Sequence, residues 1–409
     1  MTANTTAATT TSRPQIDLLD GAFWGSEPHD TYAWMRANEP VYHDEANHLW
    51  AVTRYHDLKA VERDPATFSN AGGIRPAQDA LPMMIDMDDP EHLRRRKLVN
   101  KGFTPRRVRD SQPVIEVVCD AIIDTICEQG ECDFVRDIAA PLPMIMIGDA
   151  LGVAPEDRDD LLRWSDDMVS ALSGSADPEL LTRAATAFVE YTEYATKAIE
   201  QRRIDPTDDL MSILVHAEVD GEKLDLDSLV QESLLILVGG DETTRHVLSG
   251  GFYELLRVRA RFEELAGDRS LIDTAVEEML RWVSPIKNMA RTATRDVELA
   301  GARIPAGEKL LLAFPSANRD EAVFERAEEF DLRRTPNEHV AFGFGTHFCL
   351  GASLARLEIR TMVDRVLTRL PDLELTQVDG LPRRPANFVS GLEAMPVRFT
   401  PTAPVGATA

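Results

Sequence analysis

Apolar residues recur at helical spacing through most of the chain. From Asp89 to about Leu280 they fall three or four positions apart, which predicts a succession of α-helices. One predicted helix is long. It begins after Asp225 or Asp227, either of which can cap it, and its pattern runs through "LDSLVQESLLILVGGDETTRHVLSGGFYELLRVR". The central part of the chain is therefore predicted to be helical.

The pattern differs near both ends of the chain. "PVYHDEANHLWAVTRY" places two short β-type runs around the turn-forming "DEAN", which predicts a hairpin. After Pro285, "RTATRDVELAGARIPAGEKLLLAF" alternates and turns at glycines, as short strands do. We predict a mainly α protein (α+β) in which small antiparallel sheets come from both ends of the sequence.

The domain organisation is predicted to be simple. Residues 1–14 and 401–409 are expected to be flexible tails. Between them there is no low-complexity linker and no internal repeat, so residues 15–400 are expected to form a single domain.

Charge and cysteine content narrow the class of protein. The formal net charge of −25 argues against binding to nucleic acid or to an anionic membrane, because both need a basic face. The four cysteines form no C-x-x-C pair, which favours a reducing cytoplasm over a disulfide framework. The polar N-terminus has no apolar signal core. The most apolar stretch, "IAAPLPMIMIGDALGV", is too short and broken for a transmembrane anchor. We expect a cytoplasmic protein.

A glycine-rich segment, "FGFGTHFCLG", precedes a predicted helix and contains Cys349. A free cysteine is most often a small buried hydrophobe. Here, however, Gly345 and Gly351 allow a sharp turn and a close approach to a flat group, and the following helix directs its N–H groups at the sulfur. A thiolate in such a setting suits an axial position of a haem iron, whereas zinc would need further ligands at characteristic spacings that the sequence lacks.

Phe342, Gly345, Cys349 and Gly351 form the pattern Phe-x-x-Gly-x-x-x-Cys-x-Gly, which resembles the haem-binding loop of the cytochrome P450 monooxygenases. The resemblance extends over almost the whole chain, from "HDTYAWMRANEPV" to "GLEAMPVRF". It implies the triangular, mostly helical fold of that family. It also implies haem b with Cys349 as the thiolate ligand, and insertion of one oxygen atom of dioxygen into a C–H bond.

Other family motifs agree. Glu278 and Arg281 match the family's Glu-x-x-Arg pair, and Arg334 resembles its third partner. Within the long helix, "GGDETT" contains two glycines that are unfavourable in a helix interior. In the family the matching helix bends over the haem. By this resemblance Thr243 stabilises the oxygen species at the iron and Glu242 passes protons to it, and both are predicted catalytic residues.

The resemblance also implies contacts to the rest of the haem and to the substrate. Four residues match the family's partners for the haem propionates: His92, Arg96, Arg291 and His347. The expected substrate pocket consists of Leu235, Val238, Gly239, Ile286, Phe388 and Val389, with the loop "SNAGGIRPAQDALPMMIDM" as a mobile entrance. These positions are apolar or glycine, which favours a lipophilic substrate. The alternative for any single one of them is ordinary core.

The chain looks most similar to actinobacterial members that hydroxylate the terminal methyl group of a sterol side chain, as in cholesterol or cholest-4-en-3-one. A macrolide, terpenoid or fatty-acid-like substrate is the alternative, and a haem-thiolate peroxygenase or a non-enzymatic haem sensor is a further one. The family receives electrons from a ferredoxin and its reductase, which use NAD(P)H. The docking surface is expected on a basic run of residues: Arg94, Arg95, Arg96, Lys97, Lys101, Arg106, Arg107 and Arg109.

Overall fold

The structure, a computed structural model, describes residues 13–172, 177–219 and 221–406. The predicted tail residues 1–12 and 407–409 lie outside this range. The described ends contact the body of the protein. Arg13 pairs with Glu39 at 2.9 Å, and the amides of Val405 and Gly406 donate to the Asp124 carboxylate at 2.9 Å.

Helices dominate the described chain, as the apolar spacing predicted. The longer helices are α2 (His29–Asn38), α3 (Tyr55–Arg63), α4 (Glu91–Val99), α6 (Gln112–Asp124), α7 (Pro141–Leu151), α8 (Arg158–Leu172), α9 (Pro178–Ile204), α11 (Leu226–Leu256), α12 (Arg259–Gly267), α13 (Ile272–Val283) and α15 (Ala352–Arg369). The shorter helices are α1 (Gly21–Gly25), α5 (Pro105–Asp110), α10 (Leu210–His216) and α14 (Phe314–Ala317). Single turns of other helix types are η1 (Met84–Asp86), η2 (Asn100–Gly102), η3 (Val135–Ala139), η4 (Pro155–Asp157), η5 (Arg269–Leu271) and η6 (Gly345–His347).

The strands are β1 (Val41–Asp44), β2 (Leu49–Val52), β3 (Phe68–Ser69), β4 (Glu131–Asp133), β5 (Asn288–Ala293), β6 (Val297–Leu299), β7 (Ala302–Ile304), β8 (Lys309–Ala313), β9 (Glu374–Leu375) and β10 (Pro396–Arg398). The predicted hairpin is β1–β2. It joins the segment after Pro285 in a five-stranded sheet with the order β1-β2-β8-β5-β3. Most pairs in this sheet are antiparallel, but β2 and β8 run parallel. The prediction that strands from distant parts of the chain share a sheet is confirmed.

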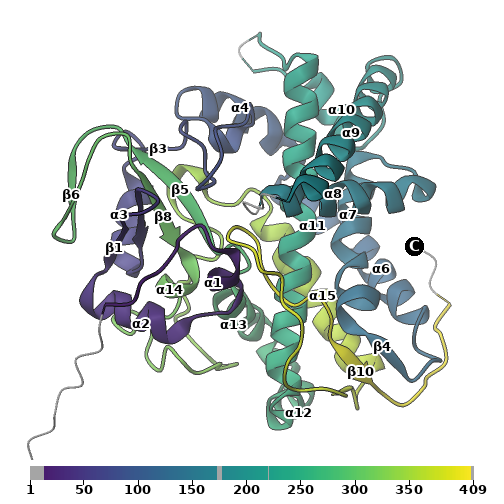
Figure 1. Ribbon diagram of the computed structural model, residues 1–409. Coiled ribbons are helices and arrows are strands. Elements are labelled where there is room, and N and C mark those ends of the chain that lie inside the picture. The colour runs from purple at the N-terminus through teal and green to yellow at the C-terminus, as the bar shows by residue number, and fades with distance from the viewer. Residues whose placement is uncertain (1–12, 173–176, 220, 407–409) are drawn as a thin grey trace, which may run out of the picture.

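Helix α11 runs through the middle of the molecule, between the five-stranded sheet and helices α6 to α10 (Figure 1). It begins where predicted, because the Asp225 side chain accepts a hydrogen bond from the amide of Ser228. Such a cap stabilises a helix by about 1 kcal/mol. The helix is buried on several sides, including against α7, α13 and α15, which explains its apolar run.

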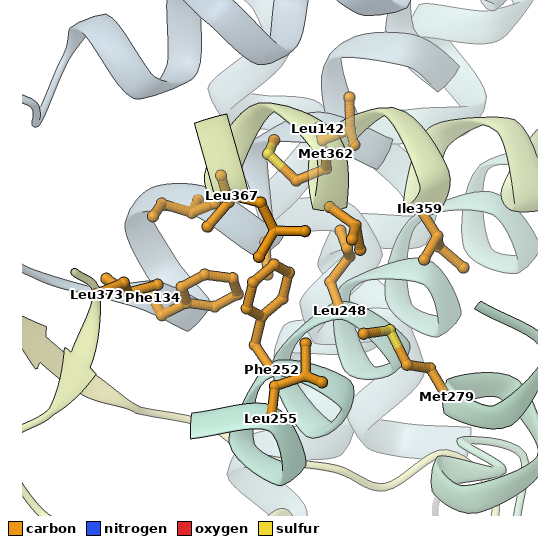
Figure 2. Packing of buried hydrophobic residues seen from close by; sticks show 14 of the residues in the cluster. Phe134, Leu142, Leu248, Phe252, Leu255, Met279, Ile359, Met362, Leu367 and Leu373 are labelled. Carbon is orange, nitrogen blue, oxygen red and sulfur yellow. The ribbon is translucent and has the colours of Figure 1, made fainter. Parts of the chain in front are cut away.

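The largest apolar cluster packs α11 against α6, α13 and α15 (Figure 2). Phe134 and Phe252 lie at its centre, with their rings 4.6 Å apart. Truncation of a fully buried phenylalanine typically lowers the free energy of unfolding by about 3–5 kcal/mol. This cluster therefore holds α11 and α15 in fixed positions relative to each other.

A buried ionic network holds the chain that leads to the glycine-rich loop. Arg281 lies 2.7 Å from Glu278, and Arg334 lies 3.1 Å from the same carboxylate. Arg281 also donates to the carbonyl oxygens of Asn318 and Ala327. The predicted three-residue network is confirmed. Because its charges are buried and paired, loss of one partner would leave an uncompensated charge inside the protein.

Candidate active site

A cavity of about 260 Å³ lies between α11 and the glycine-rich loop that precedes α15. All the predicted site residues line it except Glu242 and Gly345. These lining residues are His92, Arg96, Leu235, Val238, Gly239, Thr243, Ile286, Arg291, Phe342, His347, Cys349, Gly351, Phe388 and Val389. The structure thus brings together side chains from α4, α11, β5, the loop and the C-terminal segment.

The loop is shaped by a backbone hydrogen bond and by Gly345. The amide of Cys349 donates to the carbonyl oxygen of Phe342 at 2.9 Å, which closes the loop. Gly345 has a φ of +74°, and a Cβ there would lie 2.4 Å from the carbonyl oxygen of Glu62. Gly345 is therefore required by a left-handed backbone and a close approach to α3, although it does not line the cavity.

Cys349 has solvent-accessible surface that opens into the cavity. Burial in the molecule raises the pKa of its thiol, and the amides of Gly351 and Ala352, together with the positive charges of Arg96 and Arg356, partly offset this effect. The helix terminus alone therefore does not produce a stable thiolate, and a cation bound at the sulfur would be needed for that. Among the described residues, Cys349 is the only cysteine that lines the cavity.

Two guanidinium groups and two imidazoles gather at one edge of the cavity. The rings of His92 and His347 lie 3.9 Å apart, and Arg96 donates to the carbonyl oxygen of Phe348. Arg291 is 3% exposed and lies 3.4 Å from the carboxylate of Glu62. Burial lowers the pKa of His347 to about 2, so that ring is neutral at neutral pH, whereas the two arginines carry the positive charge of this edge.

The cavity wall formed by α11 has open space above Gly239. No atom lies within 4 Å of a Cβ built on Gly239. One turn later, the Thr243 hydroxyl donates to the Gly239 carbonyl at 3.3 Å. The resemblance implies a bend here, and the structure has one continuous α-helix from Leu226 to Leu256 through this point.

Glu242 does not line the cavity, which the sequence reasoning did not foresee. Its carboxylate pairs with Arg245, lies 2.8 Å from Arg384 and 3.3 Å from His246 Nε2. Although burial alone would raise the pKa of Glu242, His246 and the two guanidinium groups hold it well below its usual value. Glu242 is therefore a carboxylate in a buried ionic cluster behind Thr243.

Two further acids belong to this cluster and were missed. Asp166 from α8 and Asp241 have carboxylate oxygens close to those of Glu242. Burial and the proximity of Glu242 raise the pKa of each of them to about 7. A metal ion is not required to balance these three acids, because Arg245 and Arg384 already supply two positive charges.

The apolar wall of the cavity combines α11, the segment after α13 and the C-terminal segment. Ile286 and Val389 form an isolated antiparallel bridge. Phe388 and Val389 pack in one cluster with Ile74, and Val238 packs against it. All six predicted pocket residues line this one cavity, although their spacing in the sequence gave no indication of contact.

The expected entrance loop is held by buried acids. Asp86 accepts hydrogen bonds from the amides of Ile74 and Leu81 at 2.8 and 2.9 Å and pairs with Arg75. Glu232 of α11 accepts from the amide of Met84 at 2.8 Å. These contacts tie the loop to itself and to α11.

Comparison with known proteins identifies the family. A profile of the family described as cytochrome P450 matches residues 83–391. The chain belongs to the cytochrome P450 family. A steroid C26-monooxygenase of Mycobacterium tuberculosis is 59% identical over 97% of this chain and the whole length of that one. A steroid C26-monooxygenase of Mycolicibacterium smegmatis is 56% identical over 96% of this chain and 98% of that one.

Solved structures of the family share the fold. Cytochrome P450 CYP268A2 of Mycobacterium marinum, in complex with pseudoionone, matches with a TM-score of 0.87 and 34% identity over 96% of this chain and all of that one. CYP109E1 of Bacillus megaterium in complex with testosterone has a TM-score of 0.83 and 34% identity over 91% of this chain and 99% of that one. The predicted P450 fold is confirmed, as is the prediction of a haem-thiolate monooxygenase. Among the described residues, no helix is long and apolar enough to cross a membrane.

Proposed function

We propose that this P450 hydroxylates the terminal methyl group of a steroid side chain. The observation that carries the proposal is a single cavity in which Cys349 lies on one side and an apolar wall lies on the other. The two mycobacterial relatives described as steroid C26-monooxygenases, with 56–59% identity over nearly the whole chain, support the substrate class.

The residues around the cavity fit a haem. Cys349 is the proposed axial ligand, since no other described cysteine reaches this space. A Cβ built on Gly351 or Gly239 would meet no atom within 4 Å, which leaves room for a flat ring. Arg96 and Arg291 offer cations for the propionates. Bound there, haem supplies the activation of dioxygen, from which one oxygen atom enters the C–H bond and the other leaves as water.

The apolar wall would hold the substrate. Val238, Ile286 and Phe388 present hydrocarbon surface to the cavity. A terminal methyl group has stronger C–H bonds than its neighbours, so reaction there must come from positioning and not from intrinsic reactivity. A wall that contacts a hydrocarbon chain along its length supplies such positioning.

Protons would reach the cavity from the charged side of α11. Thr243 lines the cavity and directly follows Glu242 in α11, and its hydroxyl can accept and donate a proton. Asp166 is partly exposed and close to Glu242, so it can exchange a proton with solvent. In this scheme Glu242 is ionised at rest, takes up a proton from Asp166 and becomes ionised again when it passes a proton on toward the cavity.

A ferredoxin, reduced by its NAD(P)H-dependent reductase, is the proposed electron donor. The exposed members of the basic run are Arg94, Lys97, Lys101, Arg106 and Arg109. Arg94 and Arg106 pair with acids on their own helices. Arg95 is not available for docking, since it lies 3.1 Å from the buried Glu232. Exposed Leu93 and Phe348, at 43% and 41%, add apolar surface on the same part of the chain as Lys97 and the Cys349 loop.

The test is titration of the ferric, haem-loaded protein with cholest-4-en-3-one. We expect a shift to high spin and, after addition of ferredoxin, reductase and NAD(P)H, a product hydroxylated at the terminal methyl group. Absence of a shift, or hydroxylation on the rings only, would refute the substrate assignment. Cys349→Ser serves as the control for the ligand, because it should abolish the thiolate spectrum of the reduced carbon monoxide complex.

A further inference from the structure

A buried glutamate at the edge of the cavity has no role in the function proposed above. Glu62, near the end of α3, lines the cavity, and its side chain is 2% exposed. One carboxylate oxygen lies 3.4 Å from Arg291, and the amide of Phe344 also donates to this carboxyl group. The other oxygen, Oε2, is buried and has no hydrogen-bond partner among the described residues. A buried acceptor without a partner is costly unless a bound group satisfies it.

Glu62 lies at the edge where the cations of the cavity gather. Arg291, its neighbour, acts electrostatically on His347, as do Arg96 and His92. A bound haem would direct its two propionates at these two guanidinium groups. The unpartnered oxygen of Glu62 is then close to negatively charged carboxylates, which cannot donate a hydrogen bond to it.

The charges of this edge decide the protonation state of Glu62. Arg96 and Arg291 supply two positive charges, and the two propionates supply two negative ones. His347 is neutral, and burial lowers the pKa of His92 as well. Arg291 would then be shared between Glu62 and a propionate, which weakens its hold on an ionised Glu62.

The other charged groups near this edge are already engaged. Lys59, on the helix of Glu62, donates to the Tyr55 hydroxyl at 3.1 Å. Asp86 is paired with Arg75, and Asp88 accepts hydrogen bonds from Ser69 and Asn70. Of these groups Lys59 lowers the pKa of Glu62, as Arg291 does, but burial has the larger effect and raises it.

We propose that Glu62 remains a neutral carboxylic acid in the haem-loaded protein and donates a hydrogen bond from its unpartnered oxygen to a haem propionate. Glu62 is thus a positioning residue for the cofactor. The inference rests on the haem of the family and on this chain's own residues, and it does not depend on the steroid substrate.

The arrangement couples electron uptake to proton binding. Even without the propionates, burial raises the pKa of Glu62 to about 7. Negative propionates raise this pKa further, so the group begins to ionise only above neutral pH. Reduction of ferric to ferrous iron adds one electron and raises the pKa again. Between the pKa of Glu62 in the ferric protein and its pKa in the ferrous protein, one proton moves from solvent to Glu62 with each electron. In this pH range the reduction potential falls as pH rises.

The test is the reduction potential of the haem-loaded protein as a function of pH, measured by spectroelectrochemistry from about pH 6 to pH 9, a range that spans the raised glutamate pKa. Wild type should show a potential that falls in the upper part of this range. Glu62→Gln keeps a hydrogen-bond donor but cannot titrate, so its potential should lack that fall. Glu232→Gln is the matched control. Glu232 is also buried and has its pKa raised to about 7 by burial, but it does not line the cavity, so this variant should retain the wild-type fall.

Infrared spectroscopy gives a second readout. At neutral pH the wild type should show the carbonyl band of a protonated carboxyl group that is absent from Glu62→Gln and present in Glu232→Gln. An equal fall of the potential in wild type and Glu62→Gln would overturn the proposal. If Glu62→Gln fails to retain haem, Glu358→Gln decides, because Glu358 also lines the cavity and burial raises its pKa to about 8: loss of the fall in this variant, or a wild-type potential independent of pH, would overturn the proposal. None of these results bears on the steroid assignment, which the substrate titration tests separately.

Discussion

Replacing Gly239 by alanine tests whether the space above this glycine is used by the substrate. No protein atom lies within 4 Å of the added methyl group, so the change introduces no clash. An alanine in a helix interior is more favourable than glycine by about 1 kcal/mol. The free energy of unfolding of the haem-loaded protein should therefore rise by about 1 kcal/mol, which corresponds to an increase of about 1–2 °C in Tm for a chain of this length.

The same methyl group should weaken substrate binding. Gly239 lines the cavity beside Val238 and Leu235, so the added carbon occupies space that the proposed steroid would fill. A change of one methyl group in an apolar pocket alters binding by about 1–3 kcal/mol, or roughly 10- to 200-fold. Titration of the ferric protein with cholest-4-en-3-one should show this loss of affinity. The spectrum without substrate should remain that of wild type.

Gly251→Ala, in the same helix, is the control. A Cβ at Gly251 would lie 2.6 Å from Cγ of Met279, which packs in the core near Leu248 and Phe252 (Figure 2). Overpacking of this kind lowers stability by about 1–3 kcal/mol. This variant should therefore be no more stable than wild type and should keep its substrate affinity. The reasoning fails if Gly239→Ala is destabilised, or if its affinity for the steroid equals that of wild type.

Three other predictions concern protons and electrons. Thr243→Ala should release peroxide in place of product, and an unchanged ratio of product to NAD(P)H consumed would remove Thr243 from the mechanism. Glu242→Gln should slow turnover. It should also lower the free energy of unfolding by about 3–5 kcal/mol, because two buried guanidinium groups lose their partner. Chemical denaturation measures this loss, and a variant as stable as wild type would contradict the prediction. Lys97→Glu with Arg109→Glu should slow electron transfer from ferredoxin most at low salt, whereas a rate independent of both charge and salt would exclude docking there.

The sequence predicted the glycine-rich loop well because each of its requirements is local. Gly345 is fixed by its own backbone conformation, and Cys349 and Gly351 follow at set distances along the chain. The long helix was predictable for the same reason, since its Asp225 cap and its apolar spacing are properties of adjacent residues. Patterns of this kind need no knowledge of the rest of the fold.

The direction of Glu242 was not predicted, and spacing along the helix does not settle it. Residues four apart share a helix face, so Gly239 and Thr243 lie together, whereas Glu242 shares its face with Arg245 and His246. Glu242 is also three residues from Gly239, so spacing alone does not decide between the two faces. The charged partners Arg245 and Arg384 do.

The partners of the buried acids could not have been predicted. Arg384 reaches Glu242 from 142 positions away, and Glu232 binds the amide of Met84 across 148 positions. No local pattern marks such pairs, because they depend on how α11 packs against the entrance loop and the C-terminal segment. Glu62 was missed for a related reason, since at the end of α3 it resembles an ordinary surface glutamate until the sheet brings Arg291 next to it.

The two faces of α11 give the proposed mechanism its direction. Leu235, Val238 and Gly239 border the apolar cavity, where a free proton or an exposed charge would be poorly solvated. Glu242 and its ionic partners lie behind the helix, next to the partly exposed Asp166. Thr243, which directly follows Glu242 in the chain, presents a neutral hydroxyl group to the cavity. Because the group that faces the substrate carries no charge, the apolar wall can remain dry while protons still reach the cavity through a single side chain.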